Sequence, residues 1–415
     1  MLILGAISSI IVKDMFLRSA LFFSLVLLTL NNSVVKGESL DMTAMKILMG
    51  SPEFRSETFS LESAIAGFKT ESNLPDPEIS GEYLVLPKDV DNRWTAQLEW
   101  SVEWPGVYGA RGKEAQRKMS VAQKEVLAQR AERLAEIKDL LLDYIRSNQK
   151  LLLLDELTKN NDTIYHLAEQ AAKGGEMTVL DLNKVKLEYA NIRVAQATLL
   201  DERSDIIGNL SRIFGKECGE LLNEMDTQFP EIILPTEEEI LRIKETAPSI
   251  QAAYAEAERA YESKKVAKME ALPSLSLGYK HAFEDGMHFN GAVFGISVPV
   301  FSSRGKQKAA KAEIMDAEFK AEAKSLEIET EAMATLKRLK LITAQIDEIA
   351  PIVENVDYNA TLLKAYKGGV LTLIEYIADR NYFTNAALEL VSLRHNAAKA
   401  LALLQRYTNS LPEDF

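Results

Sequence analysis

The sequence contains a single cysteine, Cys218, among its 415 residues. One thiol excludes an internal disulfide and a thiolate metal cluster, because each needs at least two cysteines. Basic side chains are also in the minority, with 48 Lys and Arg against 61 Asp and Glu and a formal net charge of -13. This balance argues against nucleic-acid binding, which requires a basic surface to neutralise phosphates. An acidic surface instead suits solubility, or a lumen that favours cations.

Residues that commonly carry catalysis are scarce and scattered. The four histidines are His166, His281, His288 and His395. None pairs with another at the i, i+4 spacing of a helical metal site, and we expect His281 and His288 to be ordinary polar residues beside a turn between strands. The glycines from Gly106 to Gly112 lack the lysine and serine of a phosphate loop, which indicates a bend from strand to helix. We therefore expect a non-enzymatic protein with no catalytic residue, metal site or cofactor.

A long apolar run is missing as well. The apolar stretch Ala20–Leu30 is only about a dozen residues long, too short to cross a bilayer as a helix. It follows Lys13 and Arg18 and precedes a small residue at Gly37, which is the pattern of a signal peptide over residues 1–37, with Met15 as an alternative start. A buried N-terminal helix or an anchor is the alternative. Because no later segment is long and apolar enough, any membrane-crossing part would have to be a β-barrel.

Four landmarks occur twice along the chain, in the same order. The pairs are Pro52 and Pro248, Pro77–Tyr83 and Pro273–Tyr279, Pro105 and Pro299, and Lys173–Asp181 and Lys367–Glu375. The separation is constant for the first two pairs and two residues shorter for the last two. Such ordered recurrence predicts two tandem structural repeats, over residues 38–228 and 229–415, after the signal peptide.

Each half has the same predicted order of elements. An alanine-rich helix precedes two strands, at about 77–104 and 273–300, and a long helical hairpin follows, at 106–214 and 305–410. No proline occurs between Pro105 and Pro230, and strong helix formers dominate there. Residues 113–172 would form a helix about 90 Å long, far more than a globular core needs. In the second half, Pro351 should kink or break the equivalent helix.

The segment Trp94–Trp104 alternates strictly between apolar and polar residues. Its length and period of two are typical of a transmembrane β-strand with a lipid face and a polar lumen. The corresponding segment 290–298 keeps the same phase. We expect four residues to face lipid: Trp94, Trp100, Trp104 and Phe294. A half-buried sheet in a soluble protein is the alternative, and since four strands cannot close a barrel, the barrel requires several chains.

These features resemble the TolC-like outer-membrane efflux family, and in particular its heavy-metal-type branch. The resemblance is carried by Leu74–Ser80, Glu103–Gly106, Val298–Phe301 and two Gly-Gly-x-x-Thr segments. It implies a mainly α protein with a small β part, in which a homotrimer in the bacterial outer membrane pools four strands per chain into a twelve-stranded barrel. Long helices then form a coiled-coil barrel reaching into the periplasm.

The resemblance also implies a function and partners. The helical barrel would meet a periplasmic adaptor, or membrane fusion, protein and an inner-membrane pump such as an RND-type transporter. The chain would be the channel of a tripartite efflux system, passively conducting small molecules or metal ions through a gate. A type I protein-secretion duct and a soluble periplasmic coiled-coil scaffold stay open as alternatives.

The two glycine pairs mark the predicted tips of the helical hairpins. Glycine takes left-handed backbone angles cheaply after a helix, and threonine is a good N-cap for the next one. By resemblance, the adaptor would dock on these tips, at Lys173, Gly174, Gly175, Thr178, Lys367, Gly368, Gly369 and Thr372. The alternative is that the glycines only form the turns. Acidic residues beyond the second tip, Glu375 and Asp379, would ring the closed aperture, or would belong to a solvated helix face.

Overall fold

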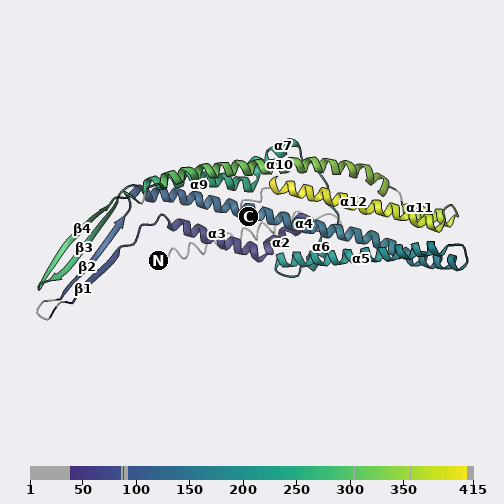
Figure 1. Ribbon diagram of the computed structural model, residues 1–415, viewed down its shortest axis with the longest axis horizontal. Coiled ribbons are helices and arrows are strands. Elements are labelled where there is room, and N and C mark those ends of the chain that lie inside the picture. The colour runs from purple at the N-terminus through teal and green to yellow at the C-terminus, as the bar shows by residue number, and fades with distance from the viewer. Residues whose placement is uncertain (1–37, 86, 88–91, 302–303, 356, 409–415) are drawn as a thin grey trace, which may run out of the picture.

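The chain forms an elongated molecule with a sheet at one end and helical tips at the other (Figure 1). A computed structural model describes residues 38–85, 87, 92–301, 304–355 and 357–408. The expected signal peptide, residues 1–37, lies outside the described residues. None of the helices in the described part is both long and apolar enough to cross a membrane.

The same order of elements occurs in both halves. The first half forms α2 (Leu40–Gly50), α3 (Pro52–Thr70), β1 (Glu78–Leu84), β2 (Arg93–Val102), α4 (Pro105–Lys173) and α5 (Val179–Phe214). Short helices α6 (Gly219–Glu224), α7 (Glu237–Leu241) and α8 (Ile243–Thr246) follow. The second half forms α9 (Pro248–Met269), β3 (Ser274–Glu284), β4 (Met287–Ser297), α10 (Lys306–Glu354), α11 (Tyr358–Lys367) and α12 (Leu373–Thr408).

The long helix is continuous in the first half of the chain and interrupted in the second half. In the first half, α4 runs for 69 residues without interruption. In the second half, Pro351 lies in the last turn of α10, which ends at Glu354, and a new helix begins after the cap Asp357. Proline lacks the amide hydrogen that the helix ladder needs and its ring crowds the preceding turn. The helix continues through Pro351 to Glu354, and the predicted break follows directly after it.

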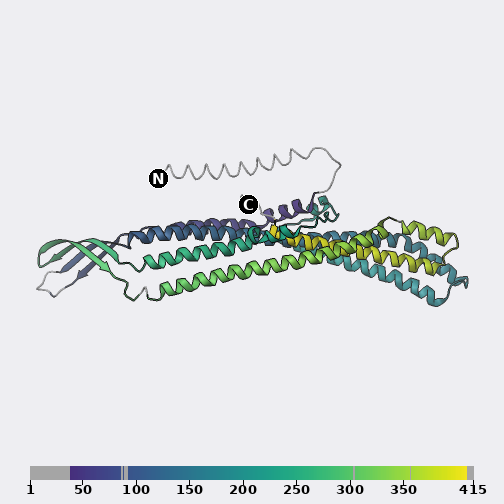
Figure 2. The ribbon, with the colours of Figure 1, turned by 90° about the horizontal axis from the view of Figure 1, so that it is seen from above.

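The four strands form one antiparallel sheet in the order β1-β2-β3-β4. The two halves meet in its middle, where β2 pairs with β3 and Gln97 lies opposite Lys280. The sheet projects beyond the ends of the helices, and none of the described helices covers either of its faces (Figures 1 and 2). Strands β1 and β4 are its two open edges within the described structure.

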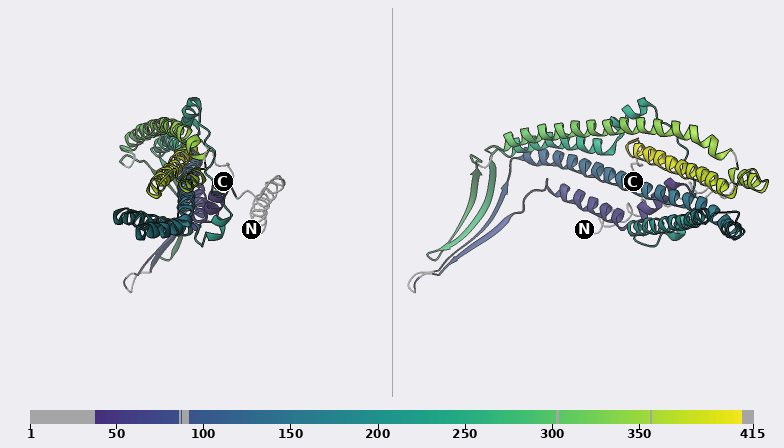
Figure 3. Two further views of the ribbon diagram at one scale, coloured as in Figure 1. Left: turned by 90° about the vertical axis from the view of Figure 1, so that its right-hand side faces the viewer. Right: turned by 45° about the vertical axis from the view of Figure 1, so that its right-hand side comes forward.

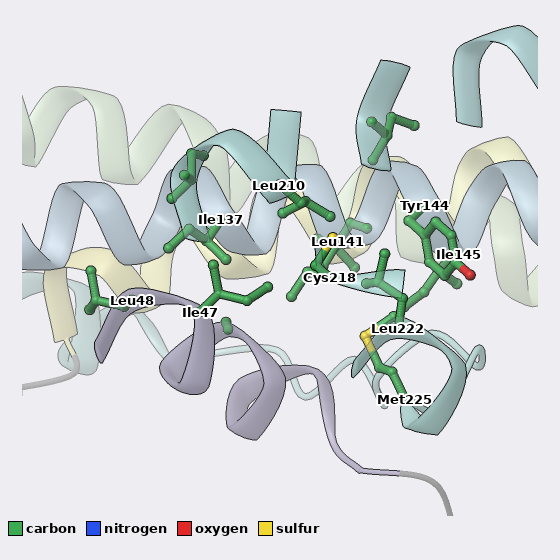
Figure 4. Close-up of a cluster of buried hydrophobic side chains, with 14 of the residues drawn as sticks. Ile47, Leu48, Ile137, Leu141, Tyr144, Ile145, Leu210, Cys218, Leu222 and Met225 are labelled. Atoms are coloured by element: carbon green, nitrogen blue, oxygen red, sulfur yellow. The ribbon is translucent and has the colours of Figure 1, made fainter. Parts of the chain in front are cut away.

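The buried apolar residues form several small clusters along the helices and not one central core. In the largest, α2 packs against α4 and α5 through fully buried Ile47, Leu141 and Leu210 (Figure 4). A second cluster joins α7 and α8 to α9, α10 and α12. The end-on view shows the helices of the second half beside those of the first (Figure 3). The long helices α5, α10 and α12 thus bury narrow stripes and leave much of their surface exposed.

Candidate functional site: a two-faced sheet and two helical tips

The register of the sheet places its apolar residues on one face. Leu98 of β2 lies opposite Ile79 of β1 and Tyr279 of β3, and directly opposite residues of antiparallel strands share a face. The set that we name the apolar face is Ile79, Tyr83, Trp94, Ala96, Leu98, Trp100, Val102, Leu275, Leu277, Tyr279, Ala292, Phe294 and Ile296. Its exposure is large, reaching 82% for Ile79 and 77% for Phe294. Contiguous apolar surface of this kind marks a contact with lipid or protein.

The other side of the sheet, which we name the polar face, carries mainly hydrophilic residues. These include Glu78, Ser80, Glu82, Thr95, Gln97, Glu99, Ser101, Ser276 and Lys280. Strand β4 adds glycines there, together with Phe289 and Val293. The sheet therefore has the two-faced pattern expected for the wall of a transmembrane barrel, in which one face contacts lipid and the other contacts water.

Three of the four residues expected to face lipid lie on the apolar face: Trp94, Trp100 and Phe294. Trp104 does not lie in a strand, because β2 ends at Val102, two residues before the alternation does. Pro105 occupies the first turn of α4, where its fixed backbone angle favours a helix start, so Trp104 becomes the N-cap. The predicted length of this strand was wrong at that end, and Trp104 marks the junction between sheet and helix.

The two histidines expected beside a turn are strand residues. His281 lies in β3 and His288 lies in β4, close to the two-residue turn at Asp285 and Gly286. Their rings approach each other, with His288 Nδ1 3.2 Å from His281 Nε2. The two histidines flank the turn as expected, but from within the strands and not from the loop. Their contact was not expected, because the register of the hairpin is needed to see that they are neighbours.

The first helical tip is a tight turn built on glycine. Gly175 has φ +77°, and the next amide, of Glu176, donates to the main-chain oxygen of Ala171 at 2.9 Å. This hydrogen bond closes α4 by satisfying a carbonyl at its end. Thr178 then begins α5, its hydroxyl accepting from the amide of Asp181 at 3.1 Å. The glycine and threonine of this segment thus have clear local roles.

The second tip repeats this geometry. Gly369 has φ +73°, and the Val370 amide donates to the main-chain oxygen of Ala365 at 2.9 Å. The Glu375 amide donates to the Thr372 hydroxyl at 3.3 Å, while the Glu375 carboxylate accepts from the Thr372 amide at 2.8 Å. This reciprocal pair is a capping box. Both tips lie at the end of the molecule opposite to the sheet (Figures 1 and 2).

Exposed apolar side chains accompany the tips, and the sequence reasoning missed them. Val179 and Leu180 begin α5 with exposures of 74% and 67%, and Val370 in the second turn is 77% exposed. Lys173 and Lys367 are exposed beside them. The sequence could have indicated them, because these apolar residues come directly after a glycine turn, where no other helix can bury them. The tips therefore present aliphatic groups flanked by positive charge.

The two acidic residues beyond the second tip point away from the bundle. Glu375 and Asp379 are exposed, one turn apart on α12. Hydrogen bonds from the Thr372 amide and hydroxyl hold the pKa of the Glu375 carboxyl below its usual range. This carboxylate thus has a local partner, whatever else it faces.

A buried arginine, also missed from the sequence, lies between the two hairpins. Arg380 of α12 is only 2% exposed, beside Tyr376 and close to Glu188 of α5. Burial lowers the pKa of the Arg380 guanidinium, and Tyr376 and Glu188 partly offset the effect. Arginine stays charged under such conditions. A positive charge therefore sits inside the apolar cluster that joins the four helices near the tips.

Similar folds occur in a membrane protein from Pseudomonas aeruginosa, in the outer-membrane channel CmeC of Campylobacter jejuni and in the outer-membrane channel MtrE of Neisseria gonorrhoeae. Their TM-scores are 0.76, 0.74 and 0.74, at sequence identities of 16%, 15% and 14%. The matches cover 91%, 89% and 89% of this chain and 91%, 85% and 88% of the others. The chain has the fold of the TolC-like outer-membrane channels.

No protein-family model and no curated protein matches the sequence. The TolC-like fold therefore rests on three-dimensional agreement over nearly the whole chain, from the sheet to the tips. On this fold the predicted site residues fall into two groups at opposite ends, the sheet residues and the tip residues. Within the described residues, no group of three or more His, Cys, Asp or Glu side chains is arranged to hold a metal ion.

Proposed function

We propose that the chain is the outer-membrane channel subunit of a tripartite efflux system and works as a homotrimer. The observation that carries the proposal is the uncovered sheet with one apolar face, one polar face and two open edges. An open edge is not tolerated in lipid, because its unpaired amides and carbonyls find no water there. If β4 of each copy pairs with β1 of the next, three copies close a barrel and every edge is removed.

The helices offer matching surfaces for the same assembly. On α5, the exposed residues Leu180, Leu187 and Val194 follow one another at intervals of seven. On α10, Phe319 and Leu326 are exposed at the same interval. A seven-residue apolar repeat is the pattern of helices that pack side by side as coiled coils. These stripes support a wall of helices shared between neighbouring copies and continuous with the barrel.

The proposed conduction is passive. The polar face lines the lumen, where Glu78, Glu82 and Glu99 bring carboxylates that favour cations. The tips lie at the periplasmic end and close the tunnel, with Glu375 and Asp379 around the aperture, and they open by rearrangement of the helices. Energy comes from an inner-membrane pump, and no catalytic step is assigned to this chain.

A periplasmic adaptor would dock on the two tips. The proposed docking residues are those expected from the sequence, Lys173, Gly174, Gly175, Thr178, Lys367, Gly368, Gly369 and Thr372, together with the exposed Val179, Leu180 and Val370. Their exposed aliphatic groups can be buried by a partner, and the flanking lysines suit an acidic rim on it. We assign the chain to the heavy-metal-type branch on the sequence segments quoted above, so small molecules or metal ions are the proposed cargo.

The oligomeric mass and single-channel conductance of the detergent-purified protein test the proposal. We expect a trimer that requires detergent and that opens discrete, cation-preferring channels in a planar bilayer. A detergent-independent species without conductance would instead support the periplasmic scaffold. Copurification with a pump and adaptor that export small solutes, as opposed to a polypeptide, separates efflux from type I secretion.

A further inference from the structure

The β3–β4 hairpin brings two imidazole rings together on the apolar side of the sheet. His281 of β3 lies opposite Asn290 of β4, and His288 lies opposite Phe283, so both histidines share a face. Their ring centroids are 5.3 Å apart, and His288 Nδ1 is 3.2 Å from His281 Nε2. The intervening turn has positive φ at Asp285 and Gly286, the conformation that matches strand twist and fixes register in a two-residue hairpin.

Neighbouring groups determine which nitrogen of His281 carries a proton. Its Nδ1 is 2.6 Å from the side-chain oxygen of Asn290, which also accepts the hydroxyl of Tyr279 at 2.8 Å. An amide oxygen only accepts hydrogen bonds, so Nδ1 of His281 is the donor. In the neutral ring, Nε2 then presents a lone pair toward His288. This is the arrangement in which a second hydrogen bond orients a metal-binding imidazole.

Aromatic neighbours restrict the positions of both rings. The Trp94 ring lies 5.1 Å from that of His281, and the Phe283 ring lies 5.0 Å from that of His288, between ring centroids. Packing of this kind limits side-chain rotation, so less conformational entropy is lost when a ligand binds. In the single chain His288 is exposed and His281 is half-buried, and both lie close to the turn that ends the sheet.

The spacing of the two nitrogens suits a shared metal ion. Two ligands on a tetrahedral Zn²⁺ with bonds of 2.0–2.1 Å lie about 3.3 Å apart, and the two imidazole nitrogens here are 3.2 Å apart. Binding would replace the hydrogen bond between Nδ1 of His288 and Nε2 of His281. Neutral His288 would carry its proton on Nε2, and both rings would turn so that the two lone pairs converge on the ion; no proton is lost. Imidazole nitrogens favour Cu²⁺, Ni²⁺ and Zn²⁺ over Mg²⁺ and Ca²⁺.

We propose that His281 and His288 form a binding site for a divalent transition-metal ion, with Asn290 as the positioning residue and water in the remaining coordination positions. The site lies on the opposite side of the sheet from the polar face, so it is separate from the proposed conduction path. It does not depend on the proposed function. A bound ion would clamp β3 to β4 near their turn.

The binding of ZnCl₂ to the assembled, detergent-purified protein without a histidine tag tests this site by calorimetry. We expect one Zn²⁺ per chain, and at least about a tenfold loss of affinity in each of His281→Ala and His288→Ala. Asn290→Leu keeps both imidazoles but removes the orienting hydrogen bond, and should weaken binding by about 10- to 100-fold. His166→Ala, which changes an exposed histidine on α4, is the matched control and should bind as the unchanged protein does.

A second measurement needs no variant and so is independent of folding defects. With one equivalent of Cu²⁺, the electron paramagnetic resonance spectrum of the unchanged protein should show coupling to two nitrogens. Coupling to one nitrogen or none would overturn the site. Unchanged Zn²⁺ affinity in both alanine variants, or displacement of Zn²⁺ by equimolar Mg²⁺, would overturn it as well.

Discussion

Nε2 of His395 on α12 lies 2.7 Å from a carboxylate oxygen of Asp143 on α4, which ties the second half of the chain to the first. Lys399 donates to the other Asp143 oxygen at 3.0 Å and to Asp139 at 2.9 Å, and Arg146 lies 4.0 Å away. Burial would raise the pKa of Asp143, but the hydrogen bonds from His395 and Lys399 outweigh it and hold the pKa below the ordinary value. Asp143 is therefore an ionised link between the two halves.

This link makes a prediction for pH dependence. A carboxyl with a depressed folded-state pKa stabilises the fold above its unfolded pKa and loses that contribution as pH falls through the folded value. Asp143→Asn should lower the free energy of unfolding at pH 7 by about 1–3 kcal/mol, and the difference from the unchanged protein should shrink below about pH 4. Denaturant midpoints at pH 7 and pH 3 measure both effects.

Asp139→Asn is the matched control for that measurement. Asp139 is 52% exposed and forms an ion pair with Lys399. Its replacement should cost less, since exposed ion pairs contribute little. Equal losses for the two variants, or a loss in Asp143→Asn that persists unchanged at pH 3, would contradict the role of Asp143.

The geometry of the first tip predicts that its two adjacent glycines differ in how well they tolerate replacement by alanine. Gly175 has left-handed angles, whereas Gly174 has φ -78° and would bring an added Cβ only to ordinary contact with the Gln170 oxygen, at 3.5 Å. Gly175→Ala should therefore destabilise the first tip by about 1–2 kcal/mol, and Gly174→Ala by much less. Hydrogen exchange of the amides from Gly175 to Asp181 reports the local effect. Equal exchange in the two variants would rule out this account of the turn.

The two faces of the sheet predict opposite responses to one added charge. Leu98→Lys puts an ammonium group on the apolar face and should block membrane assembly, since lysine in the lipid core costs roughly 2–4 kcal/mol. Thr95→Lys puts the same group on the polar face, opposite Glu82, and should assemble normally. Native gel mobility of extracted membranes distinguishes them. Assembly of both variants would mean that the apolar face does not contact lipid.

Glu375 carries two separable roles, helix capping and the proposed aperture charge. Glu375→Gln keeps a side chain that can complete the capping box but removes the charge, whereas Glu375→Ala removes both. If the charge shapes the aperture, both variants should show increased conductance and weaker cation preference in a planar bilayer. A change confined to Glu375→Ala would indicate capping alone, and would remove Glu375 from the aperture.

Much of the fold follows from local patterns in the sequence. The alternation after Trp94 gave the faces of β2, the run of helix formers after Pro105 gave α4, and Pro351 gave the break between α10 and α11. These features depend on neighbours along the chain, through the periods of strand and helix and through backbone restriction. The turn expected between His281 and His288 is formed by Asp285 and Gly286, a preferred hairpin dipeptide.

What escaped prediction depends on contacts between distant elements. The approach of His281 and His288 requires the strand register, and the burial of Arg380 requires the packing of one hairpin against the other. The end of β2 was misplaced because the alternation continues through Trp104 while the backbone already turns toward α4. In that short stretch the side-chain pattern and the backbone angle set by Pro105 point to different structures.

The open edges of the sheet give the proposed assembly a direction. In the proposed barrel, β4 of each copy pairs with β1 of the next, so every contact joins two different edges. All copies therefore have the same orientation around the ring. A chain with an intact β4 but an unusable β1 could still join on one side and would then leave the ring unable to close. When such a chain is coexpressed in excess, it would trap normal chains in open, non-functional rings. A mutation that damages only one edge strand should therefore be genetically dominant.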